Sequence, residues 1–122
     1  MKKILIADDH FEIRELIKES LIEKDYEILF SENGKNAVKL AKDENPDIII
    51  MDIMMPGRIN GLEATGIIKS EPDCCDCKII ILSAKSKDKD KIEALKAGAS
   101  AFIEKPFSSI KLLKKIEDLL ED

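Results

Sequence analysis

Residues 47–52 read DIIIMD, in which consecutive apolar residues end on a carboxylate, Asp52. Such a run is typical of a strand that is covered on both faces, as the interior strands of a parallel sheet are. A second apolar run, ILIA at residues 4–7, ends in the same way on a pair of acids, Asp8 and Asp9. The two runs predict neighbouring parallel strands with three carboxylates at one edge of the sheet.

Short apolar runs alternate with segments of helical period along the chain, a pattern typical of repeated strand–helix units. We expect strands over residues 3–7, 26–31, 47–51, 78–82 and 100–104, and helices around 13–21, over 36–44, from 61 to about 71, over 88–96 and over 108–120. Right-handed crossovers then favour a doubly wound α/β fold, a five-stranded parallel sheet in the order 2-1-3-4-5 with five helices. The second strand would lie at an edge. The first helix would bury Ile13, Leu16, Ile17 and Leu21.

The composition is that of a folded protein with a single core. Of the 122 residues, 44% are hydrophobic and 37% are charged, so we expect one domain over residues 1–122 and no output domain within it. A net charge of −5 argues against direct nucleic-acid binding and against anionic membranes. No apolar stretch reaches the roughly 18 residues of a membrane-spanning helix, and Asp8 and Asp9 interrupt the first run too early for a secretion signal. We therefore expect a cytoplasmic protein.

The three cysteines, Cys74, Cys75 and Cys77, are crowded into one polar segment. Their odd number and spacing do not fit a disulfide framework, which favours a reducing compartment. A zinc site would need a fourth ligand, and the only histidine, His10, lies at the other end of the chain beside the acid pair. We expect plain loop residues.

Two more polar residues follow the remaining interior and edge strands. Ser83 comes after the fourth strand and Lys105 after the fifth, so a hydroxyl and an ammonium join the acids at one edge. Each residue alone is better explained as a helix cap or a surface side chain, but their convergence indicates a site. Two carboxylates about 4 Å apart repel by roughly 4 kcal/mol at an effective dielectric near 20, so clustered acids bind protons or cations. A few oxygen ligands with open positions suit Mg²⁺, and the set predicts phosphoryl chemistry with a carboxylate nucleophile.

Longer motifs extend this pattern. They are ILIADD at 4–9, IIIMDIMMPG at 48–57, NGLEA at 60–64, IIILSA at 79–84 and ALKAGASAFIEKPF at 94–107. With them the chain resembles, over essentially its whole length, the receiver domain of bacterial two-component response regulators, which has a chemotaxis-regulator-like, flavodoxin-like fold. The resemblance implies a phosphorylation-controlled signalling switch. It also implies that the chain is not a turnover enzyme and catalyses only its own phosphorylation and slow dephosphorylation.

The resemblance assigns roles to the residues that match the family motif. Asp52 would be the phosphoacceptor, and Lys105 would pair with a phosphoryl oxygen. Asp9 and Asp52 would hold Mg²⁺ with the backbone carbonyl of Met54, and Asp8 would act mainly through water. These assignments follow from the resemblance alone.

The resemblance also implies a conformational switch. Ser83 would turn toward the new phosphoryl group and Phe102 would follow it inward, which would change the face formed by the fourth helix, the fifth strand and the fifth helix. Without the family, Phe102 would be read as core. The bond between Lys105 and Pro106 is typically cis in this family.

The implied partners are a sensor histidine kinase or phosphotransfer protein and a downstream effector or output domain, and a phosphorylation-dependent dimer stays open. The kinase would dock on the first helix and neighbouring loops, where His10 and Phe11 would contribute to specificity. A relay role for His10 is less expected than an exposed or capping one.

Two departures from the family pattern bear on the site. Residues 57–60 form a connection one residue longer than usual, which predicts a bulge and leaves open whether Arg58 approaches the phosphoryl group. Met54 and Lys85, two positions beyond Asp52 and Ser83, offer no base to an attacking water, so we expect slow dephosphorylation.

Two alternative functions remain at this point. A Mg²⁺-dependent phosphohydrolase with an aspartyl nucleophile would need an acid helper two residues after its nucleophile at the first strand, where this chain has adjacent acids. A phosphorylation-independent binding module of the flavodoxin type would place the acidic loop after the first strand against a flavin phosphate, and the two negative charges would repel each other. Both are weaker than the switch.

Overall fold

The computed structural model describes residues 1–74, 76–84 and 88–121. Its strands are β1 (Lys2–Ala7), β2 (Tyr26–Ser31), β3 (Ile48–Asp52), β4 (Lys78–Ser83) and β5 (Ala101–Glu104). Its helices are α1 (Phe11–Ser20), α2 (Gly34–Glu44), α3 (Gly61–Ser70), α4 (Asp88–Ala97) and α5 (Ser109–Leu120). All four strand pairs are parallel and the order is β2-β1-β3-β4-β5, which confirms the predicted fold and the edge position of β2.

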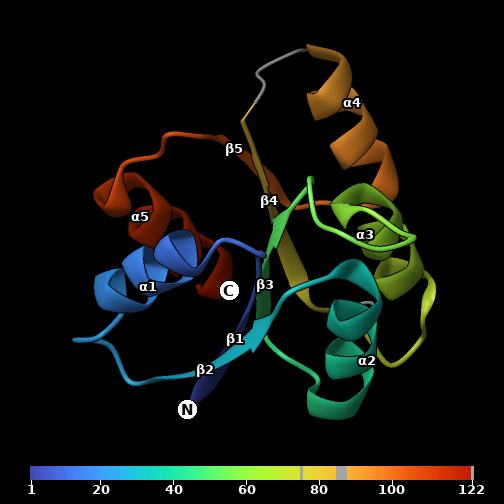
Figure 1. Ribbon diagram of the computed structural model, residues 1–122. Helices are drawn as coiled ribbons and strands as arrows, with labels where there is room; N and C mark the ends of the chain where they lie inside the picture. Colours follow the sequence, from blue (N-terminus) through green and yellow to red (C-terminus); the bar gives the residue numbers. More distant parts are fainter. Residues whose placement is uncertain (75, 85–87, 122) are drawn as a thin grey trace.

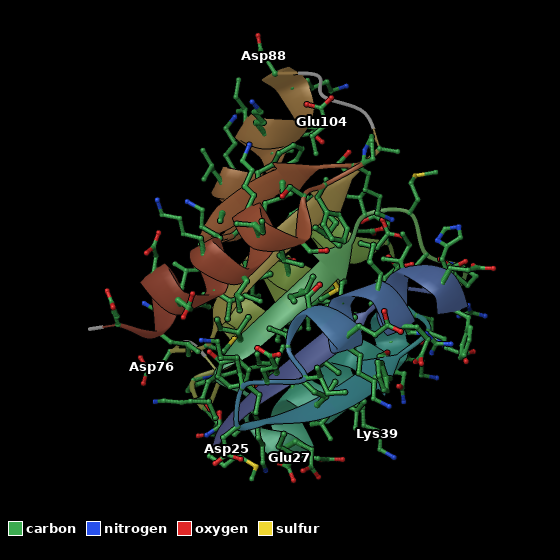
Figure 2. All side chains as sticks on the ribbon, turned by 90° about the vertical axis from the view of Figure 1, so that its left-hand side faces the viewer. Asp25, Glu27, Lys39, Asp76, Asp88 and Glu104 are labelled. Carbon is green, nitrogen blue, oxygen red and sulfur yellow. The ribbon has the colours of Figure 1, made fainter. Side chains whose placement is uncertain are left out.

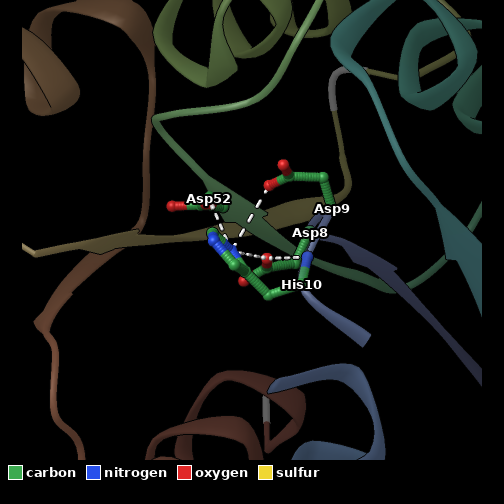
Figure 3. Close-up of side chains that lie close together, drawn as sticks. All are labelled: Asp8, Asp9, His10 and Asp52. Carbon is green, nitrogen blue, oxygen red and sulfur yellow. Dashed lines mark hydrogen bonds and ion pairs between the residues drawn. The ribbon is translucent and has the colours of Figure 1, made fainter. Parts of the chain in front are cut away.

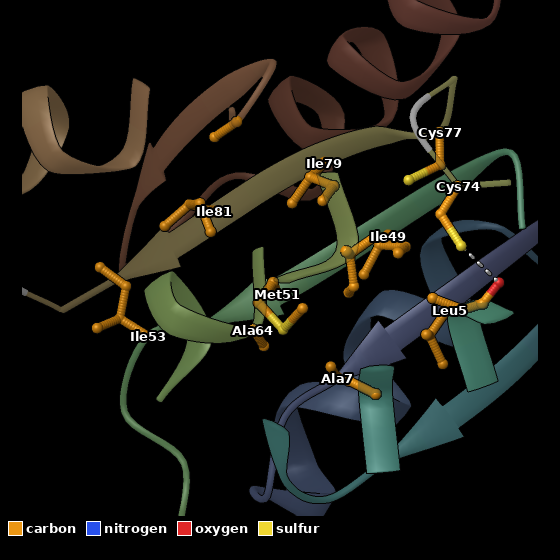
Figure 4. Packing of buried hydrophobic residues seen from close by; sticks show 14 of the residues in the cluster. Leu5, Ala7, Ile49, Met51, Ile53, Ala64, Cys74, Cys77, Ile79 and Ile81 are labelled. Carbon is orange, nitrogen blue, oxygen red and sulfur yellow. Dashed lines mark hydrogen bonds between the residues drawn. The ribbon is translucent and has the colours of Figure 1, made fainter. Parts of the chain in front are cut away.

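The sheet is covered on both faces. In Figure 1, α1 and α5 lie on one side of it, and α2, α3 and α4 lie on the other. Successive residues of each interior strand point to opposite faces, so Ile49 packs under α2 and α3 while Ile50 packs under α1 and α5. Figure 4 shows the first of these two clusters. The continuous apolar runs of β1, β3 and β4 are thus explained, because every side chain in them has a covered face to enter.

The ends of the two strands that border the site, and one core prediction, differ from expectation. β3 includes Asp52, which pairs with Leu82 of β4, so the acid is the last strand residue and does not follow the strand. β4 likewise includes Ser83. Leu16, predicted on the buried stripe of α1, is 41% exposed because Ile17 and Leu21 turn toward the sheet and carry that packing.

Cys74 and Cys77 lie in the connection between α3 and β4, as expected of loop residues, but their burial was not predicted. Cys74 and Cys77 are buried in the cluster under α2 and α3, as Figure 4 shows, and the Cys74 thiol donates a hydrogen bond to the carbonyl of Ala41 at 3.5 Å. The connection between α3 and β4 thus folds its thiols inward while Asp73 and Asp76 stay exposed. Cys75 lies outside the described residues.

Charged side chains line the periphery. Figure 2 shows acids such as Asp25, Glu27 and Glu104 pointing away from the ribbon. In the described part of the chain, no helix has the length and apolarity needed to cross a membrane.

Candidate functional site

The site forms where β1 and β3 end side by side. Ala7 pairs with Met51, so the next residues of the two strands, Asp8 and Asp52, emerge together at one edge of the sheet. The Asp8 backbone N–H donates to the Ser31 carbonyl at 3.0 Å and so continues the β1–β2 ladder past the strand end. This ladder fixes the direction of the Asp8 side chain.

Burial separates these two acids from the other carboxylates. Asp8 is 0% exposed and Asp52 is 2% exposed, and they are the charged side chains found buried in the part of the chain that the structure describes. A buried charge is costly unless it is paired, so their placement needs a compensating group.

Lys105 provides the compensation from the far end of the chain. Its Nζ lies 3.2 Å from Asp8 Oδ2 and 3.3 Å from Asp52 Oδ1. Its backbone N–H donates to the Ser83 carbonyl at 2.7 Å, which ties the end of β5 to the end of β4, and the following bond to Pro106 is cis, as expected. One ammonium thus bridges both buried carboxylates.

His10 lies beside the three carboxylates, as Figure 3 shows. Its Nδ1 lies 2.9 Å from Asp8 Oδ1, 3.3 Å from Asp9 Oδ1 and 4.0 Å from Asp52 Oδ2. Its backbone N–H also donates to Asp8 Oδ1 at 2.9 Å, which holds the start of α1 against the acid.

The electrostatics follow from this geometry. Burial, together with the neighbouring charge of Asp8, raises the pKa of Asp52, and Lys105 and a backbone hydrogen bond from Met54 oppose the rise. The hydrogen bond to Asp8, with the nearby charge of Asp9, raises the pKa of the His10 imidazole. The site therefore attracts positive charge.

The residues present fit a divalent cation. Asp8, Asp9, His10 and Asp52 each offer one ligand atom, and these atoms lie within 4.8 Å of one another. Asp52 Oδ2 is buried and has no hydrogen-bond partner among the described residues, so an oxygen is left for a cation to bind. Carboxylate oxygens of this kind are the ligands that Mg²⁺ prefers.

A family model described as the response regulator receiver domain matches residues 4–117. The chain belongs to this family. Receiver domains of two-component response regulators act as phosphorylation-controlled signalling switches and bind Mg²⁺ at an acidic pocket, so the function predicted from the sequence is confirmed at this level.

The curated relatives that this receiver domain matches are longer than the chain itself. It is 39% identical over 119 residues to the phosphate regulon transcriptional regulatory protein PhoB of Pseudomonas aeruginosa, covering 98% of this chain and 52% of PhoB. It is 38% identical over 119 residues to histidine kinase P4 of Formosa agariphila, covering 98% of this chain and 8% of that protein. A solved structure of a putative response regulator from Chloroflexus aurantiacus superposes with a TM-score of 0.92 at 26% identity, covering 99% of this chain and 98% of the other.

The receiver domain brings together four of the predicted site residues: Asp8, Asp9, Asp52 and Lys105. Ser83 is buried at the end of β4, one strand from Asp52. Met54 follows β3 and is 72% exposed, and its backbone N–H helps to lower the pKa of the Asp52 carboxyl.

The other predicted residues lie farther from the carboxylates. Phe102 lies on β5 and is half-buried against the cluster under α2 and α3. Lys91 Nζ lies 6.0 Å from the centre of its ring. Arg58 is exposed. Lys85 lies outside the described residues.

The long connection of the receiver domain is anchored at both ends. Met55 is buried, and Ile59 packs against Gly34 at the start of α2. Asn60 then caps α3 through a capping box with Glu63. Between these two anchors, residues 56–58 form an exposed tip.

The sequence prediction missed the place of His10 in the acid cluster. A histidine directly after two acids at a strand end is the available signal, but the direction of its ring depends on the hydrogen bond that its backbone makes to Asp8. That contact is visible only in the fold.

Proposed function

We propose that this receiver domain, residues 1–122, accepts a phosphoryl group on Asp52 from a histidine kinase or phosphotransfer protein in a Mg²⁺-dependent reaction. The observation that supports the proposal best is the pair of buried carboxylates bridged by one lysine, with one oxygen of Asp52 lacking a hydrogen bond. A protein has little reason to bury two acids side by side unless their charge is used.

In the proposed reaction an oxygen of Asp52 attacks phosphorus. The new oxygen–phosphorus bond forms as the phosphorus–nitrogen bond of the donor phosphohistidine breaks, and the donor nitrogen keeps the electron pair. Lys105, already beside Asp52 Oδ1, is placed to pair with a phosphoryl oxygen. When bound by Asp8, Asp9, Asp52 and the Met54 carbonyl, Mg²⁺ would offset the negative charge of the phosphoryl oxygens.

The signal would then pass along the sheet to β4 and β5. Ser83 ends β4 next to Glu104 of β5, and Phe102 pairs with Ile81 two residues earlier. A hydroxyl that turns toward a phosphoryl group on Asp52 would free space that Phe102 can enter. The face of α4, β5 and α5 would change with it and act on an effector, an output domain or a second copy.

The proposed setting is the cytoplasm, and the chain acts only on itself. The chain spans 52% of PhoB and 8% of the kinase P4, so a linked output domain and a linked kinase are both compatible with its relatives. Because Met54 supplies no base, the phosphoprotein would decay over minutes or longer, and decay within seconds would contradict this part of the proposal.

The test is phosphorylation with a small phosphodonor and Mg²⁺, followed by intact and peptide mass spectrometry. We expect a single phosphoryl group on the peptide that contains Asp52. The Asp52→Asn variant should stay unmodified, whereas Asp25→Asn, which changes an exposed acid outside the site, should be labelled like the wild type. Label on any other residue of the wild type would refute the assignment, and sustained phosphate release from phosphomonoesters would favour a phosphohydrolase.

A further inference from the structure

Each of the two buried carboxylates has one oxygen facing Lys105 and one oxygen facing His10. Asp8 Oδ2 and Asp52 Oδ1 face Lys105, whereas Asp8 Oδ1 and Asp52 Oδ2 face His10. On the His10 side, Asp52 Oδ2 is buried and accepts no hydrogen bond from the residues described. An unpaired buried oxygen costs free energy, so a cation held on this side would remove that cost.

The His10 nitrogen lies at the spacing of a ligand. Around a six-coordinate ion with bonds of about 2.1 Å, adjacent ligands are about 3 Å apart and opposite ligands about 4.2 Å apart. His10 Nδ1 lies 2.9 Å, 3.3 Å and 4.0 Å from the oxygens of Asp8, Asp9 and Asp52 (Figure 3). The first two distances are close to the adjacent spacing and the third is close to the opposite spacing, and the whole set of ligand atoms lies within 4.8 Å, so the cluster would have to close slightly around an ion.

We propose that His10 is a further ligand of the divalent cation in this site, and that its Nδ1 makes the site favour transition-metal ions such as Zn²⁺ over Mg²⁺. The proposal rests on the proposed function in one respect, that a divalent cation binds between the carboxylates. Imidazole nitrogen suits zinc, nickel and related ions, whereas Mg²⁺ takes oxygen ligands. In the ligand form the ring keeps its proton on Nε2 and directs the Nδ1 lone pair at the ion.

The backbone holds His10 in place for this role. His10 is the residue before α1, with extended backbone angles (φ −91°, ψ 111°), and its N–H donates to Asp8 Oδ1. The side chain is 56% exposed, so the ring can shift onto an ion without disturbing the core. The ring also makes no side-chain cap of α1, so its loss should not shorten the helix.

The test compares zinc and magnesium binding by the wild type, His10→Ala and Glu12→Ala. Glu12 is an exposed acid in the first turn of the same helix and serves as the matched control. Zinc affinity is measured by competition with a chromophoric chelator, and magnesium affinity by calorimetry. Zinc taken up by the cysteines at positions 74, 75 and 77 is common to all three proteins, so the difference between them isolates His10. His10 is the only histidine, so its imidazole nitrogens give unique signals in a ¹⁵N NMR spectrum.

We expect His10→Ala to weaken zinc binding by at least about tenfold, with magnesium binding changed far less. In the wild type, zinc should shift the Nδ1 signal until one equivalent is bound, and Glu12→Ala should behave in the same way. Equal zinc affinity in wild type and His10→Ala, with an unmoved ring signal but normal magnesium binding, would overturn the role of His10 alone. Failure of the wild type to bind either ion more tightly than Asp52→Asn would overturn the cation site as well.

Discussion

The carboxyl group of Asp52 is buried, so its charged form is poorly solvated in the folded protein. Its pKa is raised above the ordinary value of 3.8 because burial and the charge of Asp8 outweigh the help of Lys105. Compared with the unfolded chain, the folded state therefore favours the protonated form of this carboxyl more strongly. The stability that this gives is fully present below the pKa of the unfolded chain and is lost as the pH rises through the folded-state pKa.

Asp52→Asn should accordingly stabilise the metal-free protein at neutral pH. The difference in free energy of unfolding from the wild type should be small below pH 3.8 and should grow as the pH rises, because only the wild type must then carry the buried charge. Urea unfolding at several pH values in the presence of a chelator measures it. A variant that is less stable than the wild type at neutral pH would contradict the raised pKa of Asp52.

The charge of Lys105 beside Asp52 can be tested with a single substitution. Lys105→Met should keep much of the side chain's volume but slow phosphorylation by a small phosphodonor about 10²- to 10³-fold, since it removes the charge that faces the Asp52 oxygen. Lys111→Met, in the first turn of α5 and exposed, should react at the wild-type rate. The rate of appearance of the phosphorylated mass gives the comparison, and equal rates in all three proteins would exclude a role for the lysine.

At the scale of elements, the start of α3 supports the end of β3. Gly61 lies so close to β3 that a Cβ there would overlap the carbonyl oxygen of Asp52, and its N–H donates to the Ile53 carbonyl at 2.9 Å. Asn60 and Glu63 form the capping box that fixes where the helix begins. The backbone that carries Asp52 is thus packed directly against a helix end.

Gly61→Ala should destabilise the protein by about 1 to 3 kcal/mol, because the added methyl forces the backbone of β3 to move. Gly66→Ala in the same helix is the matched control, since a Cβ there meets nothing within 4 Å and should stabilise by about 0.5 to 1 kcal/mol. Urea unfolding of both variants and the wild type measures these changes in the free energy of unfolding. If both substitutions changed the free energy of unfolding in the same direction, the close contact between Gly61 and Asp52 would not explain the effect.

The strands were predictable because each interior run is apolar on both faces, and the acids that end β1 and β3 were predictable with them. The polar segment after α3 was not, because Cys74 and Cys77 alternate with exposed acids and no period shows which residues turn inward. The ring of His10 was missed for a similar reason. Its position depends on a loop hydrogen bond, which leaves no pattern in the sequence.

At the scale of the whole molecule, cation binding and folding are coupled. The ligand atoms come from residues 8–10 and 52, and the bridging ammonium comes from residue 105, so the site exists only in the folded chain. An ion that binds the folded state alone stabilises it by mass action.

Mg²⁺ at about 100 times its dissociation constant should therefore raise the free energy of unfolding by about 2.7 kcal/mol. The increase should vanish when a chelator is added and should be much smaller in Asp52→Asn, whereas Asp25→Asn should respond like the wild type. Thermal or urea unfolding in matched ionic strength measures it. An equal response in all variants would point to a general salt effect.

The bridge from Lys105 to Asp8 joins residues 97 positions apart, and this separation has a consequence for biosynthesis. At about 5 to 20 residues per second, the ribosome makes Asp8 roughly 5 to 20 s before Lys105. During that interval the emerging chain has its acids but not the ammonium that pairs them. Under the proposed function, a chain truncated before Lys105 would therefore lack the ammonium that faces Asp52 and should be phosphorylated poorly.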